Sequence, residues 1–478
     1  MRIPKVTFIV AIVVSYALSA AAQSKPKLTL DEFFNSVDFT ALEISPDGSS
    51  VVIGTERADW DQQVFRSDLW LYRDDGKGSL IQLTQSGHDS DPKWSPDGRW
   101  IAFLSERKPS TEKDGDADSD TRDESASQLY LISPNGGEAF AVTEGEEGVH
   151  SFSWSADSRT IYFATREPWN KTQKDDYKNE WKDVVQYRTA ERGDTIFALG
   201  LAGALERHAA APAKVERKQG DFKQDPDLTP GARPIASSPL RVEGLVTSPD
   251  GRTLAFVSNA INQRQEKYED VEIYTVGLAS VERASSPPAS AGNKAEAALT
   301  EPRRITHNQG VETHLHGAND SRRIFFSVEV GDVLGQYRDL QPHLYWVDTE
   351  SGTIEQWSKD FIGPVEHYAV ASEDVLTSAR LGTEVQMYSV GKPSESLHRL
   401  STWPGTYSRI SVAARSPRVA FVYSLLGKPE EVYLADGASK LDQGRPITSF
   451  NKLFTERDLP QGKPYQWRPT TALRLKAC

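Results

Sequence analysis

The sequence predicts an all-β protein in which one four-stranded unit recurs along the chain. Three observations lead to this prediction: a turn motif that returns several times, pairs of alternating strands between its copies, and spacings too long for single hairpins. Four short antiparallel strands per unit, repeated around a ring, form a β-propeller, which leaves few exposed sheet edges. Sandwiches and closed barrels do not predict a recurring unit of this length.

The turn motif joins two strands in each copy. Proline fixes φ, the aspartate and glycine after it tolerate turn geometry, and a β-branched or aromatic run then alternates as a strand does. The copies are ISPDGSSVVIGTER from Ile44, WSPDGRWIAFLSER from Trp94, WSADSRTIYFATRE from Trp154, TSPDGRTLAFVSNA from Thr247 and the weaker GANDSRRIFFSVEV from Gly317.

Two more strands fit between successive copies, because the turn aspartates lie 50 to 93 residues apart. Each such pair is an alternating strand, a glycine-containing turn and another strand. The pairs are DLWLYRDDGKGSLIQLTQ from Asp68, QLYLISPNGGEAFAVTEG from Gln128, VEIYTVG from Val271 leading to RRITH, and HLYWVDTESGTIEQWS from His343.

Two further units, from His367 and Ile410, have eroded turns. The sequence therefore predicts seven blades over residues 28–450, with six or eight as alternatives, followed by an exit segment and tail over 451–478. Loop insertions interrupt the rhythm; they cover the acidic residues 108–127, the charged and in part helical residues 167–239, and the low-complexity stretch ASVERASSPPASAGNKAEAAL from Ala279.

The first residues have the pattern of a secretory signal. Arg2 and Lys5 precede the apolar run Val6–Leu18, and small residues follow. We expect a signal peptide over residues 1–22, cleaved after its last alanine, and a periplasmic or extracellular chain. A membrane anchor is the alternative, but the run is short for a bilayer and contains Ser15. No later segment is long enough to span a membrane, so none is expected after cleavage.

Net charge, cysteine count and hydrophobic content limit the partners and the sources of stability that the chain can have. The net charge of −13 predicts repulsion from nucleic acid, so no nucleic-acid partner is expected. The single cysteine, Cys478, allows no disulfide within the chain. Hydrophobic residues make up 38% of the chain, which is enough for ordinary globular cores. Stability is therefore expected to come from packing.

Two surface motifs were weighed as sites. Asp114, Asp116, Asp118 and Asp120 alternate as in a calcium loop, but an EF-hand loop needs glycine sixth and glutamate twelfth, where this chain has serines. A solvated acidic loop is the favoured interpretation. The sequence Asn170–Thr172 fits a glycosylation motif, which is interpreted as chance.

Two histidines were weighed as metal ligands. His314 and His316 alternate on a predicted strand, so both are expected on one side. Nothing nearby in sequence completes a metal site, and the favoured role is polar lining of a sheet or channel. No metal or other cofactor is therefore predicted.

Serine catalysis within the chain is not predicted. A nucleophile elbow needs the pattern G-x-S-x-G between a buried strand and a helix. The nearest approach, Gly437–Leu441, lacks the second glycine, and no buried strand is expected beside it. P-loop, dinucleotide and H-E-x-x-H motifs are absent from the sequence as well. The sequence thus supplies no candidate catalytic, cofactor-binding or metal-binding residue.

The run WSPDGRWIAFLSER, followed by SQLYLISPNGGEAFAVTEG, resembles the propeller of the prolyl oligopeptidase family, especially bacterial dipeptidyl aminopeptidases and acylaminoacyl-peptidases. The segment Gly444–Trp467 resembles the stretch by which these enzymes leave the last blade. The resemblance covers about residues 28–467. S-P-D-G alone also occurs in TolB-like and similar WD40-like propellers, so the blade order and exit segment carry the specificity.

In that family the exit segment leads into an α/β-hydrolase domain, whereas this chain continues after Trp467 with RPTTALRLKAC. No triad residue can be carried over, and a truncated reading frame or one half of a split gene is expected. The resemblance implies a secreted propeller that admits short peptides to a serine peptidase site on a separately encoded hydrolase domain. A TolB-like periplasmic interaction module and a remnant that is never stably produced are the alternatives.

Overall fold

The structure is a computed structural model that describes residues 25–107, 126–166, 171–181, 192–210, 229–259, 271–278, 299–333, 341–371, 374–463, 465–467 and 475–477. Within these residues the protein is all-β, as the sequence predicts, with a few short helices. Its strands form antiparallel meanders in chain order. No helix in the described ranges is long and apolar enough to cross a membrane.

The recurring turn determines how each sheet starts. In the first sheet the hydroxyl of Ser45 donates to Asp47 at 2.6 Å, and Gly48 takes a φ of 77°, which glycine adopts without strain. The chain can then reverse between an inner strand and a second strand. The first sheet has the order β1 (Asp38–Ile44), β2 (Ser50–Asp59), β3 (Val64–Arg73) and β4 (Ser79–Gln82).

Four more sheets repeat this meander. The second sheet contains β5 (Asp89–Trp94), β6 (Ile101–Ser105), β7 (Gln128–Ile132) and β8 (Phe140–Ala141), and the third contains β9 (Val149–Trp154), β10 (Thr160–Arg166), β11 (Asp194–Gly200) and β12 (Ala232–Ser238). The fourth sheet contains β13 (Arg241–Thr247), β14 (Thr253–Asn259), β15 (Ile273–Gly277) and β16 (Arg303–Arg304). The fifth sheet contains β17 (Gln309–Gly317), β18 (Arg323–Asp332), β19 (His343–Asp348) and β20 (Ile354–Gln356).

An eight-stranded sheet follows, and a separate antiparallel pair of short strands, β29 (Tyr465–Trp467) and β30 (Leu475–Ala477), comes after it. The eight-stranded sheet consists of two such meanders, whose ladders meet in a parallel bridge between Val385 and Thr406. The sixth meander contains β21 (Val365–Val370), β22 (Val375–Leu381), β23 (Glu384–Val390) and β24 (His398–Arg399); the seventh contains β25 (Thr406–Val412), β26 (Val419–Leu425), β27 (Lys428–Ala435) and β28 (Arg445–Pro446).

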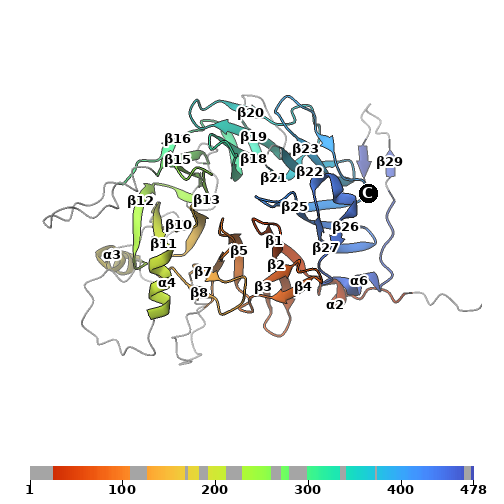
Figure 1. Ribbon diagram of the computed structural model, residues 1–478, viewed down its shortest axis with the longest axis horizontal. Coiled ribbons are helices and arrows are strands. Elements are labelled where there is room, and N and C mark those ends of the chain that lie inside the picture. Colours follow the sequence, from red (N-terminus) through yellow and green to blue (C-terminus); the bar gives the residue numbers. More distant parts are fainter. Residues whose placement is uncertain are drawn as a thin grey trace, which may run out of the picture.

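The meanders are arranged around a ring, with their first strands toward the middle and their last strands outward (Figure 1). The hydrophobic core is divided accordingly into clusters, each shared by two neighbouring meanders. One cluster joins the last meander to the first: Ile53 of β2 and Val422 of β26 belong to it. The ring is therefore propeller-like and is held together by packing between sheets.

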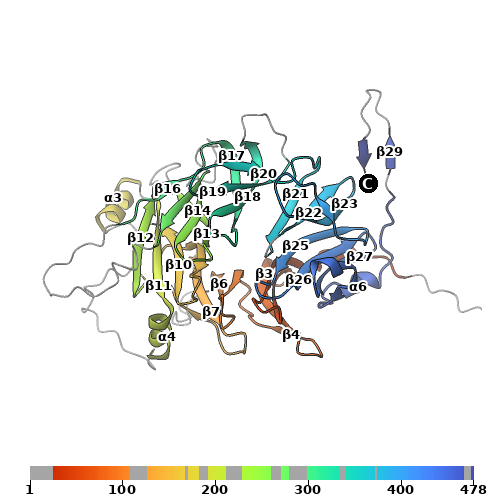
Figure 2. The same ribbon diagram turned by 45° about the horizontal axis from the view of Figure 1, so that its top comes forward.

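The amino-terminal segment of the described chain is bonded to the segment that follows the last large sheet. Helix α2 (Leu30–Phe33) begins with a capping box, in which Thr29 and Glu32 bond each other's backbone N–H groups. The Glu32 carboxylate also receives hydrogen bonds from the guanidinium of Arg457, which follows α6 (Lys452–Thr455). Both views place α6 beside β27 (Figures 1 and 2).

One prediction about the insertions was wrong. Residues 167–239 were interpreted as an insertion, yet they contain β11 and β12, the outer half of the third sheet. The predicted helical material is present as α3 (Lys171–Trp181) and α4 (Leu201–Ala210). The strands were missed because α4 and residues 211–228 separate them, so no short turn marks the hairpin.

Candidate functional site

The inner strands are the candidate site, because they surround the middle of the ring and carry accessible polar side chains. The first strand of each meander contacts that of a neighbour: β1 contacts β5 and β25, β13 contacts β9 and β17, and β21 contacts β17 and β25. Side-chain bonds add to these contacts. The indole N–H of Trp94 donates to the Glu43 carbonyl at 3.1 Å, and that of Trp154 to the Lys93 carbonyl at 3.2 Å.

Every inner strand has an irregularity in its ladder with the second strand. It falls near the residue three positions before the end of the strand. In β5, β13, β17 and β25 this residue is the first of two that the pairing skips. A bulge turns a side chain out of the regular alternation, and bulges are common beside functional sites. The seven equivalent residues are Ala41, Asp91, Ser151, Gly244, His314, His367 and Arg409.

Four of these residues have a left-handed backbone. Gly244 takes a φ of 60° without strain, but Asp91, His314 and Arg409 take φ values of 47°, 53° and 45°. That conformation costs an L-residue other than glycine roughly 1–2 kcal/mol. Strained residues of this kind persist where the surrounding structure holds them, and they concentrate at functional sites. All three non-glycine side chains are exposed.

One sector of the inner strands is basic. His314, His367 and Arg409 occupy equivalent positions on the neighbouring strands β17, β21 and β25. Burial, with smaller contributions from the charges of Arg409 and His314, lowers the pKa of His367 to about 4. The hydroxyl of Tyr368 donates to the His314 carbonyl, which ties β21 to β17.

The sector on β1 and β5 contains acidic groups. Burial raises the pKa of Glu43 to about 7, against the opposing influence of Lys93. The ammonium of Lys93 lies 3.2 Å from the Asp91 carboxylate and donates to the Phe152 carbonyl at 2.9 Å. The inner surface therefore carries ionisable groups of both signs.

A histidine and an aspartate approach each other in the third sheet. His150 Nε2 lies 3.6 Å from the Asp194 carboxylate. Burial is the largest cause of the lowered pKa of His150, about 4, and of the raised pKa of Asp194, about 6. Asp194 accepts a hydrogen bond from the Val242 backbone N–H at 2.8 Å. This bond links the third sheet to the fourth, so the pair has a structural role.

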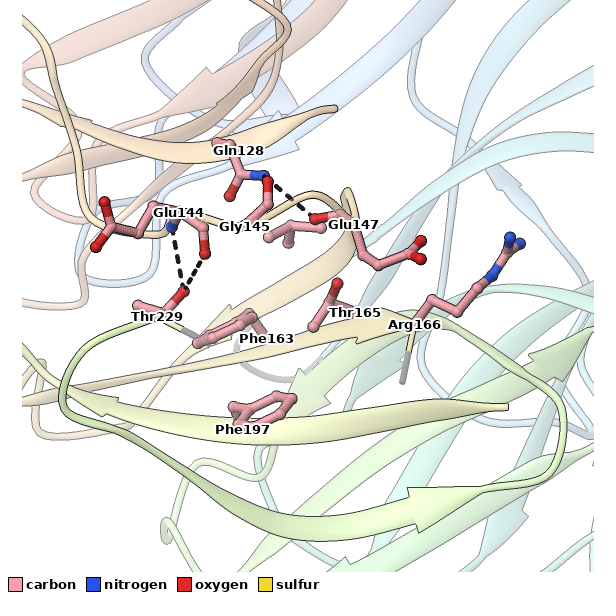
Figure 3. Close-up of a pocket in the computed structure, with 10 residues that line it drawn as sticks. Gln128, Glu144, Gly145, Glu147, Phe163, Thr165, Arg166, Phe197 and Thr229 are labelled. Atoms are coloured by element: carbon pink, nitrogen blue, oxygen red, sulfur yellow. Dashed lines mark hydrogen bonds between the residues drawn. The ribbon is translucent and has the colours of Figure 1, made fainter. Parts of the chain in front are cut away.

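Two of the cavities in the described part of the chain are lined by none of the seven equivalent residues. The one in Figure 3 lies around Gln128, Glu144 and Thr229, with a volume of about 20 Å³, room for a single water. Its walls bond each other: the Glu144 backbone N–H donates to the Thr229 hydroxyl at 3.1 Å. The other is a polar crevice of about 360 Å³ among the Pro-Asp-Gly turns, where Asp47 and Arg415 are among the lining residues.

The histidines predicted to line a channel are both exposed on β17. His314 belongs to the bulge, whereas His316 pairs with Phe325. One nitrogen of each ring has a local contact: His314 Nδ1 with Thr313 Oγ1 at 3.0 Å and His316 Nδ1 with the Gly317 carbonyl at 2.8 Å. Within the described ranges, no three histidine, cysteine, aspartate or glutamate side chains are placed to hold a metal ion.

The remaining motifs have different outcomes. The acidic run 114–120 lies outside the described residues, as do Asn170 of the glycosylation motif and Cys478. One detail about Gly437–Leu441 was wrong, because a buried strand, β27, does precede it. Ser439 is nevertheless exposed, in the 3-10 helix Ala438–Gln443.

Sequence reasoning missed the bulged positions. Only Gly244 gave a local signal, because an isolated glycine within a strand pattern suggests a bulge. The residues His314, His367 and Arg409 align only after the strand ends are known.

Comparison with known proteins supports the resemblance seen in the sequence. No family model matches the chain. An uncharacterized peptidase, YuxL of Bacillus subtilis (strain 168), is 26% identical over 242 residues, which is 49% of this chain and 32% of that protein. This chain therefore spans about a third of the length of that curated relative.

Solved structures of peptidases have the same fold. The acylaminoacyl peptidase of Pyrococcus horikoshii matches 95% of this chain with a TM-score of 0.58 and 13% identity, over 58% of its own length. A puromycin-hydrolyzing peptidase of Mycobacterium tuberculosis matches 95% of this chain with a TM-score of 0.56 and 12% identity, over 59% of its own length. The resemblance to the propeller part of prolyl-oligopeptidase-like peptidases is confirmed.

Proposed function

We propose that this chain, which matches the propeller part of these peptidases, is the substrate-gating propeller of a secreted serine peptidase similar to prolyl oligopeptidase. The catalytic α/β-hydrolase domain would then lie outside these 478 residues. One observation carries the proposal: the structural match takes in 95% of this chain but only 58% of the acylaminoacyl peptidase. The unmatched remainder of that enzyme has the size of a second domain.

We also propose that the ring has seven blades. The core clusters support this count, since each lies between two neighbouring meanders and one of them joins the seventh to the first. Because side-chain packing joins the seventh meander to the first, the ring does not need one sheet that combines strands from both ends of the chain. It can also hold a constant opening at its middle, which a size-selective gate requires.

An apolar face supports the presence of a partner domain. Strands β2, β22 and β26 all run away from the recurring turns, so the hairpins that follow them lie at the opposite side of the ring, the hairpin face. Large exposed hydrophobic side chains gather at these hairpins: Trp60 (58% exposed), Val64, Phe65 (69%), Leu381, Leu425 and Leu426 (60%). Clustered exposed apolar side chains mark interaction sites.

The amino-terminal segment extends this face. The ring of Phe34 lies 6.2 Å from that of Trp60, and the Trp60 indole donates to Asn35 at 2.8 Å. Phe33 and Leu30 are exposed beside them. The Glu32–Arg457 pair connects the same region to the exit segment, so a domain continuing from either end would meet apolar surface.

A capture experiment tests the proposal. The purified chain, immobilised, is incubated with an extract of the cells that produce it, and bound proteins are treated with a fluorophosphonate, which labels serine hydrolases. We expect one labelled protein of hydrolase-domain size. A double variant, Phe65→Ser with Leu426→Ser, removes two exposed anchors and is expected to reduce its recovery about tenfold.

The matched control replaces polar residues at the turn face, Arg99→Ser with Arg252→Ser, both of which have highly exposed side chains. This control is expected to recover the labelled protein at the unmodified level. Capture of an unlabelled envelope protein alone would favour the TolB-like interaction module. Equal recovery by the hairpin-face variant and the control would contradict the assignment of the docking face.

A further inference from the structure

Three neighbouring inner strands present hydrogen-bond donors from equivalent positions. The side chains are those of His314 on β17, His367 on β21 and Arg409 on β25, each three residues before the end of its strand. All three are accessible to solvent, and His314 and Arg409 are exposed. The backbone strain at His314 and Arg409 is maintained, although three of the turn copies of the same chain use glycine at their left-handed position.

The guanidinium of Arg409 keeps most of its donors available. Among the described residues it makes one hydrogen bond, from Nη1 to the Thr40 carbonyl at 2.8 Å, which fixes its place beside β1. Within the described part of the chain, no carboxylate lies within 4.0 Å of it. The charges of Glu430 and Asp38 reach it from a greater distance, while burial lowers its pKa.

Two carboxylates lie beside the histidines, and one of them is paired with a residue outside the sector. Glu366, next to His367, forms an ion pair with Arg380. Glu329 lies 3.9 Å from His314 Nδ1, at the outer limit of an ion pair between two exposed groups. Arg409 therefore supplies the positive charge of this sector, and its remaining guanidinium N–H groups can contact an anion.

We propose that His314, His367 and Arg409 form a carboxylate-binding site, which takes the carboxyl terminus of short peptides at the middle of the ring. This inference rests on the proposed gating function and deepens it. An arginine fork binds a carboxylate through two parallel hydrogen bonds, and imidazole N–H groups add further donors. Inorganic anions share this chemistry only in part, because they lack a peptide chain to contact the neighbouring strands.

A terminal carboxylate is the group that this selection needs. Every short peptide carries a terminal carboxylate whatever its sequence. A site that recognises only this carboxylate therefore leaves the choice of peptide side chains to another site. Internal segments of a folded protein present no such carboxylate. The site would thus hold chain ends at the gate and add a chemical criterion to selection by size.

Calorimetric titration of the free chain tests the proposal. The probes are trialanine and trialanine amide, which differ only in the terminal charge. We expect trialanine to bind at least about tenfold more tightly than the amide. Arg409→Asn, which suits a left-handed backbone, is expected to abolish this preference, and Arg409→Lys to retain part of it. Arg252→Asn, the same change at an exposed turn, is expected to leave it intact.

Competition with sodium acetate and with sodium phosphate distinguishes a site for peptide carboxylates from a site that binds any small anion. Both are expected to compete only weakly with trialanine. The proposal is overturned if acid and amide bind equally, if Arg409→Asn preserves the preference, if phosphate binds more tightly than trialanine, or if neither peptide saturates by about 10 mM. The hydrolase capture depends on hairpin-face residues, so either result can fail without the other. Thermal unfolding confirms that the Arg409 variants are folded.

Discussion

At the residue scale, the recurring turn tolerates serine where most copies have glycine. Gly48, Gly98 and Gly251 have φ values of 70–77°, while Ser158 and Ser321 stand in the same place at 62° and 58°. Each serine hydroxyl accepts a hydrogen bond from a backbone N–H of the preceding sheet's turn: Ser158 from Asp97 and Ser321 from Asp250, both at 3.0 Å. A bond between blades offsets the strain that glycine would avoid.

Substitutions at Ser158 test this balance. Ser158→Gly relieves roughly 1–2 kcal/mol of strain but loses a hydrogen bond of about 1 kcal/mol, so stability is expected to change by less than about 1 kcal/mol. Ser158→Ala keeps the strain and loses the bond, and a loss of about 1–2 kcal/mol is expected. Urea unfolding followed by fluorescence measures both. An alanine variant as stable as the parent would refute the compensation.

At the element scale, the sequence predicted strands better than their irregularities. The alternating runs after Asp68, Gln128 and His343 became β3–β4, β7–β8 and β19–β20, because apolar alternation and a nearby turn act locally. The bulges were not predicted. A bulge leaves one or two residues of a strand unpaired without changing the kinds of residue in that strand, so the sequence carries little signal for it. The position of the bulge depends on how neighbouring inner strands pack around the ring.

A buried carboxyl group on β17 makes a prediction about pH. Glu312 is 1% exposed and accepts hydrogen bonds from Thr306 at 2.7 Å and Asn308 at 2.5 Å. Burial raises its pKa from 4.5 to about 8, and the nearby charge of Glu272 raises it too. The folded state therefore holds a proton that the unfolded state releases between these values, so this group lowers stability as pH rises through that window.

Glu312→Gln mimics the protonated group and removes this titration. The melting temperature of the variant relative to the parent is expected to rise as pH is raised from 6 to about 9. Glu355→Gln, at an exposed position on β20, is the control and should track the parent. A difference between Glu312→Gln and the parent that stays constant over this pH range would contradict the raised pKa.

At the scale of the whole molecule, the two faces of the ring differ in chemistry. The turn face carries ordered aspartates and a polar crevice, and the hairpin face carries exposed aromatic and aliphatic side chains. The repeats in the sequence predicted the ring. Which face is polar and which is apolar became clear only from the positions of the hairpins in the structure. No disulfide is available to the chain, so packing between blades must hold the ring.

The exposed hairpin face predicts self-association of the free chain. Without a partner domain, Phe65 and Leu426 face water and favour contacts between copies. The concentration-dependent increase in sedimentation coefficient is expected to diminish in the variant Phe65→Ser with Leu426→Ser. The turn-face control, Arg99→Ser with Arg252→Ser, should sediment as the parent does. Identical behaviour of all three proteins would argue against an unpartnered face.

Export makes a separate prediction. If residues 1–22 are a signal peptide, the mature protein from the producing cell begins at Gln23. Peptide mapping of the purified native protein measures its first residue. Recovery of peptides from the apolar run Val6–Leu18 in the mature protein would support the membrane-anchor alternative instead.

The most direct test of the account is whether the chain performs serine chemistry by itself. The purified chain is incubated with a fluorophosphonate and with alanyl and N-acetyl-alanyl p-nitroanilides, and its intact mass and the released chromophore are recorded. The account predicts neither covalent label nor turnover, because it assigns catalysis to a proposed domain outside these residues. Stoichiometric labelling of one serine, with turnover lost when that serine is replaced, would contradict it.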